Sequence, residues 1–204
     1  MFGVADYGAF VVAVVVFLAV PGPGNLALMT ATGQGGVRAG LAATLGVMAG
    51  DQVLLWLAVA GVAALLMAHP LAFMAVQWLG AAYLVWLGWQ MLRTRPGDAP
   101  VVRMDHHHYF RQSALITVLN PKAIVFYVAF FPQFVDPAQH QGLRTFGFMA
   151  LTIAALTWVY GLIIVLLTYY LSDRLRAHPR WGRWLEQLAG LLLIGFGLKL
   201  AFSK

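Results

Sequence analysis

The chain has 204 residues, of which 61% are hydrophobic and 10% charged, and its formal net charge is +6. In soluble domains about a quarter of the residues are charged, so this composition excludes an ordinary soluble protein and indicates an integral membrane protein. Cysteine is absent, which excludes disulfide bonds and thiolate metal sites. The basic residues gather in short loops, where they indicate membrane topology and not a surface for nucleic acid.

Six apolar segments of about 20 residues or more follow one another along the chain. They are Tyr7–Thr32, Leu41–Met67, Leu71–Leu92, Phe110–Val135, Thr145–Leu171 and Trp184–Phe202. About 20 apolar residues in a helix cross a hydrocarbon core of roughly 30 Å, and lipid-exposed backbone of this kind must be helical. The sequence therefore predicts one all-α membrane domain over residues 1–204, a bundle of about six transmembrane helices. A re-entrant first segment, which would leave five full spans, is the alternative.

Arginine residues distinguish the two sides of the membrane. The first, third and fifth loops contain nine arginines: Arg38, then Arg93, Arg95, Arg103 and Arg111, then Arg174, Arg176, Arg180 and Arg183. The second loop has none, and the fourth has only Arg144. Because cytoplasmic loops are enriched in basic residues, the odd-numbered loops are expected in the cytoplasm and both termini on the periplasmic side.

The linker at residues 93–109, which is expected to be cytoplasmic, divides the chain into half-repeats at about residues 1–92 and 110–204. Each half has three segments, so the second half enters the membrane in the opposite direction. The first segment of each half is broken by proline, at Pro21-Gly22-Pro23 and at Asn120-Pro121. Paired broken segments are typical of transporters built from inverted repeats, with a site near the midplane. The layout predicts a 3+3 inverted repeat with broken first and fourth helices.

Two ionisable residues fall deep inside predicted spans. Lys122 lies about 12 residues from the start of its segment, roughly 18 Å at the helical rise, and Asp51 lies about 15 Å deep by the same measure. Charged residues at such depth are costly and usually face a cavity or a partner. We expect Lys122 and Asp51 to approach one another or to share one polar cavity. A lysine that bridges carbonyls at a kink, and an aspartic acid bonded to a neighbouring helix, are the purely structural alternatives.

The sequence PGPGN at residues 21–25 cannot continue a regular helix. Pro21 and Pro23 lack N–H groups, and Gly22 and Gly24 allow conformations that other residues avoid. From Asn25 onward a new half-helix is expected, whose free amides and positive dipole end favour a carboxylate. A carrier of amino acids or organic acids needs such a group, although a kink that serves packing alone is also compatible with the sequence.

These motifs resemble the lysine exporter (LysE/RhtB) family of bacterial amino-acid efflux permeases over nearly the whole chain. The resemblance rests on PGPGN, on GVMAGD at residues 46–51, on LGAAYLVWLGWQMLR at residues 79–93 and on NPKAIVFYVAFFPQFV at residues 120–135. It implies a small multi-pass exporter of the bacterial inner membrane that moves amino acids or related metabolites outward, driven by the proton gradient. No enzymatic activity, cofactor or bound metal is implied, and the expected partners are the substrate, protons and lipids.

The resemblance, together with the depth of the polar residues, suggests roles for particular positions. Pro21, Gly22, Pro23, Gly24, Asn25, Asn120, Pro121 and Lys122 are assigned to substrate binding, and Asp51 to proton coupling. In this hypothesis the substrate carboxylate docks on Lys122 and on the half-helix amides, while Asp51 receives the substrate ammonium or a proton. An exporter of metal cations or another small solute, and a non-transporting membrane subunit, are the alternatives. The sequence leaves homo-oligomerisation open.

Overall fold

The computed structural model describes residues 2–20, 22–68, 107–136 and 141–176, together with residues 104, 105 and 139 and isolated helical positions at 78–93 and 187–198. Side chains are described in these ranges except at residues 62–68, 129–130 and 171–176. The predicted segments Leu71–Leu92 and Trp184–Phe202 therefore lie outside the described residues apart from those isolated positions. Pro21 and most of the linker at residues 93–109 also lie outside them.

The described chain is helical throughout. Its elements are α1 (Tyr7–Ala19), α2 (Pro23–Ala68), α4 (Tyr109–Val118), α5 (Pro121–Val125), the π-helical turn η1 (Phe126–Phe130), the 3-10 turn η2 (Phe131–Phe134) and α6 (Leu143–Arg176). Among the described residues, β-type pairing is confined to one bridge between Val4 and Val135.

Two helical stretches, Pro23–Gly61 and Leu143–Tyr170, are long and apolar enough to cross a membrane. The bent pair Tyr109–Val118 and Pro121–Phe134 is a third candidate if it forms one span. These helices agree with the predicted integral membrane protein, and the six-helix inverted repeat stays a prediction.

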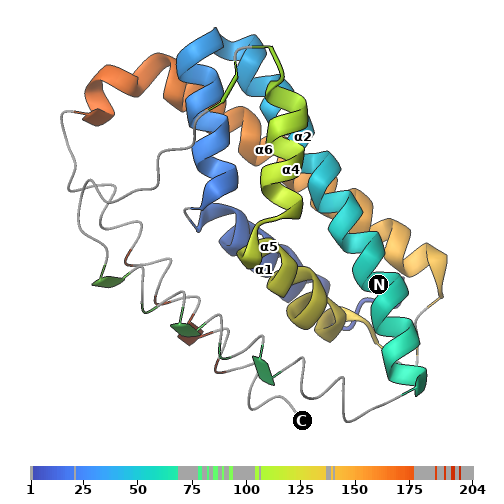
Figure 1. The fold of residues 1–204 in the computed structure, drawn as a ribbon. Coiled ribbons are helices and arrows are strands. Elements are labelled where there is room, and N and C mark those ends of the chain that lie inside the picture. Colours follow the sequence, from blue (N-terminus) through green and yellow to red (C-terminus); the bar gives the residue numbers. More distant parts are fainter. Residues whose placement is uncertain are drawn as a thin grey trace.

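Helix α2 turns back on itself at Gly36. The backbone there has φ 69° and ψ −163°, a conformation that only glycine adopts without strain. Thr32 and Gly40 are eight residues apart, which would separate them by about 12 Å along a continuous helix. Instead, a Cβ added at Gly40 would collide with the Thr32 hydroxyl. The two arms of α2 are visible in Figure 1. The arm before Gly36 corresponds to the last part of the first predicted segment, and the arm after it corresponds to the second predicted segment.

The turn at Gly36, the start of α4 and the end of α6 lie at one end of the bundle (Figure 1). A Cβ added at Gly35 would lie 3.1 Å from the Tyr109 hydroxyl, and one at Gly36 would lie 3.8 Å from the Tyr169 ring. Arg38, two residues after the turn, and Arg111, in the first turn of α4, are thus on the same side, as the positive-inside prediction requires. The opposite end is closed by the N-terminal segment, whose Ala5 N–H donates to the Phe134 carbonyl over 2.9 Å.

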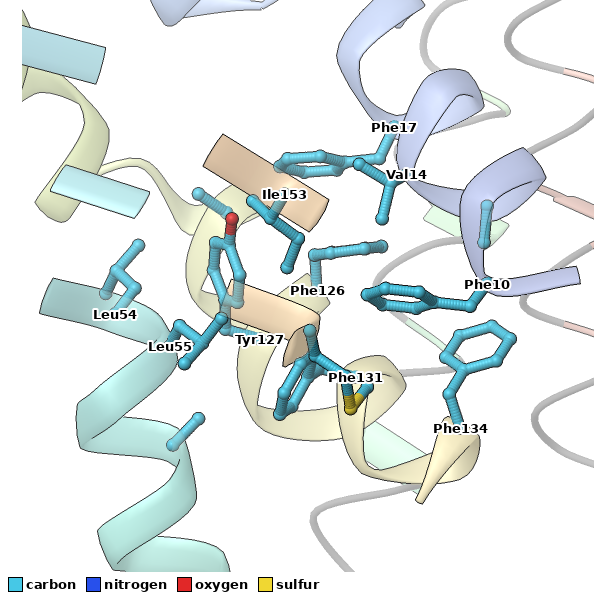
Figure 2. Close-up of a cluster of buried hydrophobic side chains, with 14 of the residues drawn as sticks. Phe10, Val14, Phe17, Leu54, Leu55, Phe126, Tyr127, Phe131, Phe134 and Ile153 are labelled. Atoms are coloured by element: carbon cyan, nitrogen blue, oxygen red, sulfur yellow. The ribbon is translucent and has the colours of Figure 1, made fainter. Parts of the chain in front are cut away.

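Buried aromatic rings fill the region between α1 and the turns η1 and η2 (Figure 2). The Phe17 and Phe126 rings are stacked with centroids 4.1 Å apart, and the Phe10 and Phe134 ring centroids are 5.4 Å apart. Tyr127 and Phe131 complete this layer and are almost inaccessible to solvent. This layer packs α1 against the segment that follows the Asn120-Pro121 break.

Candidate functional site

The two predicted breaks are present, and they lie side by side. Helix α1 ends at Ala19 and α2 begins at Pro23, with Val20 extended at φ −62° and ψ 118°. Helix α4 ends at Val118 and α5 begins at Pro121. The α4 and α5–η axes differ by 54°. Hydrogen bonds from the second break reach the first, so both interruptions belong to one polar layer inside the bundle.

The second break is formed by the sequence Asn120-Pro121-Lys122. Proline disfavours a helical residue before it, and Asn120 is extended at φ −77° and ψ 114°. Pro121 occupies the first turn of α5, where its missing N–H needs no partner. The Asn120 side-chain oxygen accepts a hydrogen bond of 3.1 Å from the Lys122 backbone N–H. Asn120 is therefore the N-cap of α5, a local role in which it binds a backbone group of its own helix.

The Lys122 ammonium is bound by the end of α1. Its Nζ donates to the Val20 carbonyl over 2.7 Å and to the Phe17 carbonyl over 3.1 Å. It also lies 4.7 Å from the centre of the Phe17 ring. Carbonyls at a helix C-terminus lack intrahelical donors and carry the negative end of the helix dipole. The residue is 7% exposed, so these contacts replace hydration for a charge that would otherwise be costly to bury.

Asn25 strengthens the same junction from the first turn of α2. Its side-chain nitrogen lies within hydrogen-bonding distance of the Leu18 carbonyl at 3.0 Å, the Val20 carbonyl at 3.2 Å and the Tyr160 hydroxyl at 3.2 Å. The side chain thus connects α1, α2 and α6. Asn25 was predicted to bind substrate. Its amide nitrogen, however, already faces oxygen atoms of the protein, so this nitrogen serves the fold.

Asp51 is buried on the second arm of α2, with an exposed fraction of 2%. The Thr157 hydroxyl of α6 donates to its carboxyl oxygen over 3.4 Å. The fully buried Tyr127 hydroxyl is close enough to interact with the carboxyl group, although it makes no direct hydrogen bond to a described atom. Asp51 and Lys122 lie within electrostatic reach of each other but form no direct ion pair. The expected proximity is therefore present without a salt bridge.

Small residues let the second arm of α2 pack closely against α4. A Cβ added at Gly46 would collide with the Phe110 carbonyl oxygen, and one at Gly50 would lie 2.7 Å from the Thr117 Cβ. Helices approach this closely only where one of them has no side chain. Gly50 directly precedes Asp51, so the contact of α2 with α4 fixes the height of the carboxyl group relative to the second break.

Most of the predicted site residues that are described lie at this junction. A Cβ at Gly22 would be 3.3 Å from the Lys122 Nζ, whereas one at Gly24 would meet no atom within 4 Å. Pro23 starts α2 and Pro121 starts α5. Among the described residues, no group of three or more His, Asp or Glu side chains gathers.

Sequence reasoning missed the partners of the two ionisable groups. These are the Phe17 and Val20 carbonyls for Lys122 and the Thr157 hydroxyl for Asp51. The Tyr160 hydroxyl, which contacts Asn25, was also missed. For the carbonyls, the sequence did contain a signal. A break directly after an apolar run ends a helix there and leaves its last carbonyls without donors from the same helix. Thr157 and Tyr160 have no signal of their own, since threonine and tyrosine are common in helices of this kind.

Comparison with known proteins agrees with the motifs. The family model described as "LysE type translocator" matches residues 15–204. An uncharacterized membrane protein of Pseudomonas aeruginosa is 35% identical over 207 residues, covering 98% of this chain and 96% of the relative. Leucine efflux proteins of Klebsiella pneumoniae and of Enterobacter sp. (strain 638) are 34% and 35% identical, each over 98% of this chain and over 96% and 97% of their own lengths. No solved structure matches. The chain belongs to the LysE type translocator family, as a multi-pass membrane protein.

Proposed function

We propose that this protein is a secondary active exporter of amino acids or related small metabolites, located in the bacterial inner membrane. The observation that carries the proposal is the junction of two broken helices, where a buried lysine and a buried aspartic acid share one polar layer. Family membership and relatives named leucine efflux protein support this assignment. We therefore expect leucine and similar aliphatic amino acids among the substrates.

In this proposal Lys122 receives the substrate carboxylate, and the residues from Gly22 to Asn25 bind the substrate beside it. Pro21, Asn120 and Pro121 keep the two helices broken, so that backbone groups remain available at mid-depth. Two carbonyls bind the ammonium of Lys122. An ammonium group has three N–H donors, so the third can contact an arriving substrate oxygen before the other two leave the carbonyls. Alternating access would follow if the two halves rock about this junction.

Asp51 is proposed as the proton-carrying group. It is buried, hydrogen-bonded by Thr157 and close to Tyr127. Among the residues that the structure describes, it has no direct cationic partner that would hold it permanently as an anion. An inward proton releases about 2.3 kcal/mol per 100 mV of membrane potential. At that potential one proton per neutral substrate supports at most about a 50-fold outward gradient before any contribution from pH.

Proteoliposomes preloaded with labelled amino acids test this function. Release is compared with and without an imposed proton gradient for the wild type, Lys122→Gln and Asp51→Asn. We expect the gradient to accelerate leucine release by the wild type, and both substitutions to abolish that acceleration. Arg111→Gln, in the exposed first turn of α4, is the matched control with one charge removed elsewhere. If no amino acid moves under any condition, the proposal fails and the cation exporter and the membrane subunit become the leading alternatives.

We further propose that Arg38 faces the cytoplasm and that both termini lie on the periplasmic side. The chain has no cysteine, so a single introduced cysteine is the one thiol of the protein that a maleimide can label. Arg38→Cys and Gln139→Cys place exposed thiols near opposite ends of the bundle. An impermeant maleimide added to intact cells should label Gln139→Cys and spare Arg38→Cys, and the reverse pattern would invert the orientation.

A further inference from the structure

We propose that the C-terminal end of α1 is a binding site for a primary ammonium group, and that Lys122 fills it as a tethered ligand when no substrate is bound. The site consists of the Phe17 and Val20 carbonyls and the face of the Phe17 ring. Lys122 Nζ lies 3.1 Å, 2.7 Å and 4.7 Å from these three groups, in that order. Carbonyl oxygens and an aromatic face are the groups that bind alkylammonium cations.

The geometry does not require a lysine of this chain at that position. The hydrogen bonds and the ring contact of the head group are made by Phe17 of α1 and by Val20, the residue that follows α1. The lysine side chain arrives from α5, across a separate break. The acceptors are backbone atoms at a helix terminus, so they exist whether or not Lys122 is present. Gly22 allows the ammonium to approach closely, since a Cβ there would crowd Nζ at 3.3 Å. A free primary ammonium can therefore make the same contacts.

The exchange explains how a zwitterion is accommodated, and this part rests on the proposed function. An arriving amino acid places its ammonium on the Phe17 and Val20 carbonyls and displaces Lys122. The displaced ammonium then pairs with the substrate carboxylate, so that no charge is left buried without a partner. A simple amine would displace Lys122 without supplying that carboxylate, and an N-acylated amino acid lacks the ammonium. Both are expected to bind the wild type poorly.

A cavity-and-rescue experiment tests the site without relying on transport. Lys122→Ala removes the Cγ, Cδ, Cε and Nζ atoms, and n-propylammonium replaces those atoms one for one. We expect n-propylammonium to raise the Tm of purified Lys122→Ala by about 2–4 °C in a saturable manner. The wild type and Arg111→Ala, in which Lys122 still occupies the site, should not respond. Tetramethylammonium, which has the charge but no N–H donor, and n-propanol should have no effect on Lys122→Ala.

The aromatic face gives a graded second test. In the Lys122→Ala background, Phe17→Leu keeps both carbonyls and removes the ring. The affinity for n-propylammonium, taken from the dependence of Tm on its concentration, should fall by about 2- to 30-fold. If Lys122→Ala aggregates on purification, extraction in the presence of n-propylammonium should restore a monodisperse protein, and extraction with tetramethylammonium should not.

The outcomes separate this inference from the proposed function. Absence of any response of Lys122→Ala to n-propylammonium, or an equal response to tetramethylammonium, overturns the ammonium site even if wild-type proteoliposomes release leucine. A specific n-propylammonium response with no amino-acid release supports the site and defeats the proposed function. Leucine release that is inhibited by excess isoleucine but unaffected by N-acetyl-leucine, together with the n-propylammonium response, supports both.

Discussion

The two helix breaks look alike in sequence but contribute opposite chemistry. The break between α1 and α2 presents acceptors, because the carbonyls at the end of α1 have no partners in their own helix. The break between α4 and α5 supplies the donor, since the Lys122 ammonium crosses to the Val20 and Phe17 carbonyls. Without the other break, each break would leave buried polar groups without hydrogen-bond partners. The comparison shows that the breaks are complementary, and each one makes the other tolerable.

The asparagines at the two breaks differ in the same sense. Asn120 acts within its own helix, where its oxygen caps the first turn of α5. Asn25 acts across helices, where its nitrogen reaches carbonyls of α1 and the Tyr160 hydroxyl of α6. One asparagine therefore shapes a break, and the other joins a break to the rest of the bundle.

Removal of the donor should have the largest effect on this pairing. Lys122→Met keeps much of the apolar side-chain volume and leaves the Phe17 and Val20 carbonyls without their ammonium. Hydrogen bonds to charged groups contribute about 1.5–3 kcal/mol each, so we expect a loss of about 3 kcal/mol in unfolding free energy. Thermal unfolding in detergent measures it, with the exposed Arg111→Met as control. A Tm equal to that of the wild type would show that the bridge contributes nothing to stability.

The contact of α2 with α4 should rank second. Gly46→Leu places a side chain against the Phe110 carbonyl, and overpacking of this kind costs about 1–3 kcal/mol. Gly24→Ala is the matched glycine control, because a Cβ there meets no atom within 4 Å and alanine favours a helix by up to about 1 kcal/mol. The two variants should change the Tm in opposite directions. Equal losses at both positions would mean that the contact of α2 with α4 has no special role.

The cross-helix asparagine should have an intermediate effect. Asn25→Ala removes the donor to the Leu18 and Val20 carbonyls, and we expect a loss of about 1–2 kcal/mol. Tyr160→Phe, which removes only the hydroxyl, should cost less. A double-mutant cycle between Asn25 and Tyr160 measures their coupling, which should be at least about 0.5 kcal/mol for residues in direct contact. Additive losses would contradict a connection of α2 to α6 through this pair.

The smallest change in unfolding free energy is expected when the hydrogen-bond partner of Asp51 is replaced. Thr157→Val removes a long hydrogen bond of 3.4 Å to Asp51, so we expect a loss of about 1 kcal/mol or less. Under the proposed function its main effect lies elsewhere, in the pH dependence of gradient-driven release. Transport by Thr157→Val measured across a pH series should show a shifted profile with an unchanged selectivity among amino acids. A profile identical to the wild type would remove Thr157 from the proton-coupling group.

The amino-acid sequence by itself determined that the helices break at PGPGN and at Asn120-Pro121, because proline and glycine act on the local backbone. It also determined that Asp51 and Lys122 lie deep in apolar segments. Only the tertiary structure decided what those two residues contact. The acceptors for Lys122 are backbone oxygens of a phenylalanine and a valine, and every residue carries such an oxygen, so no side-chain pattern announces them. Their availability depends on where α1 stops, which the PGPGN motif sets locally, and on which helix faces that end, which the fold of α2 against α4 and α6 decides.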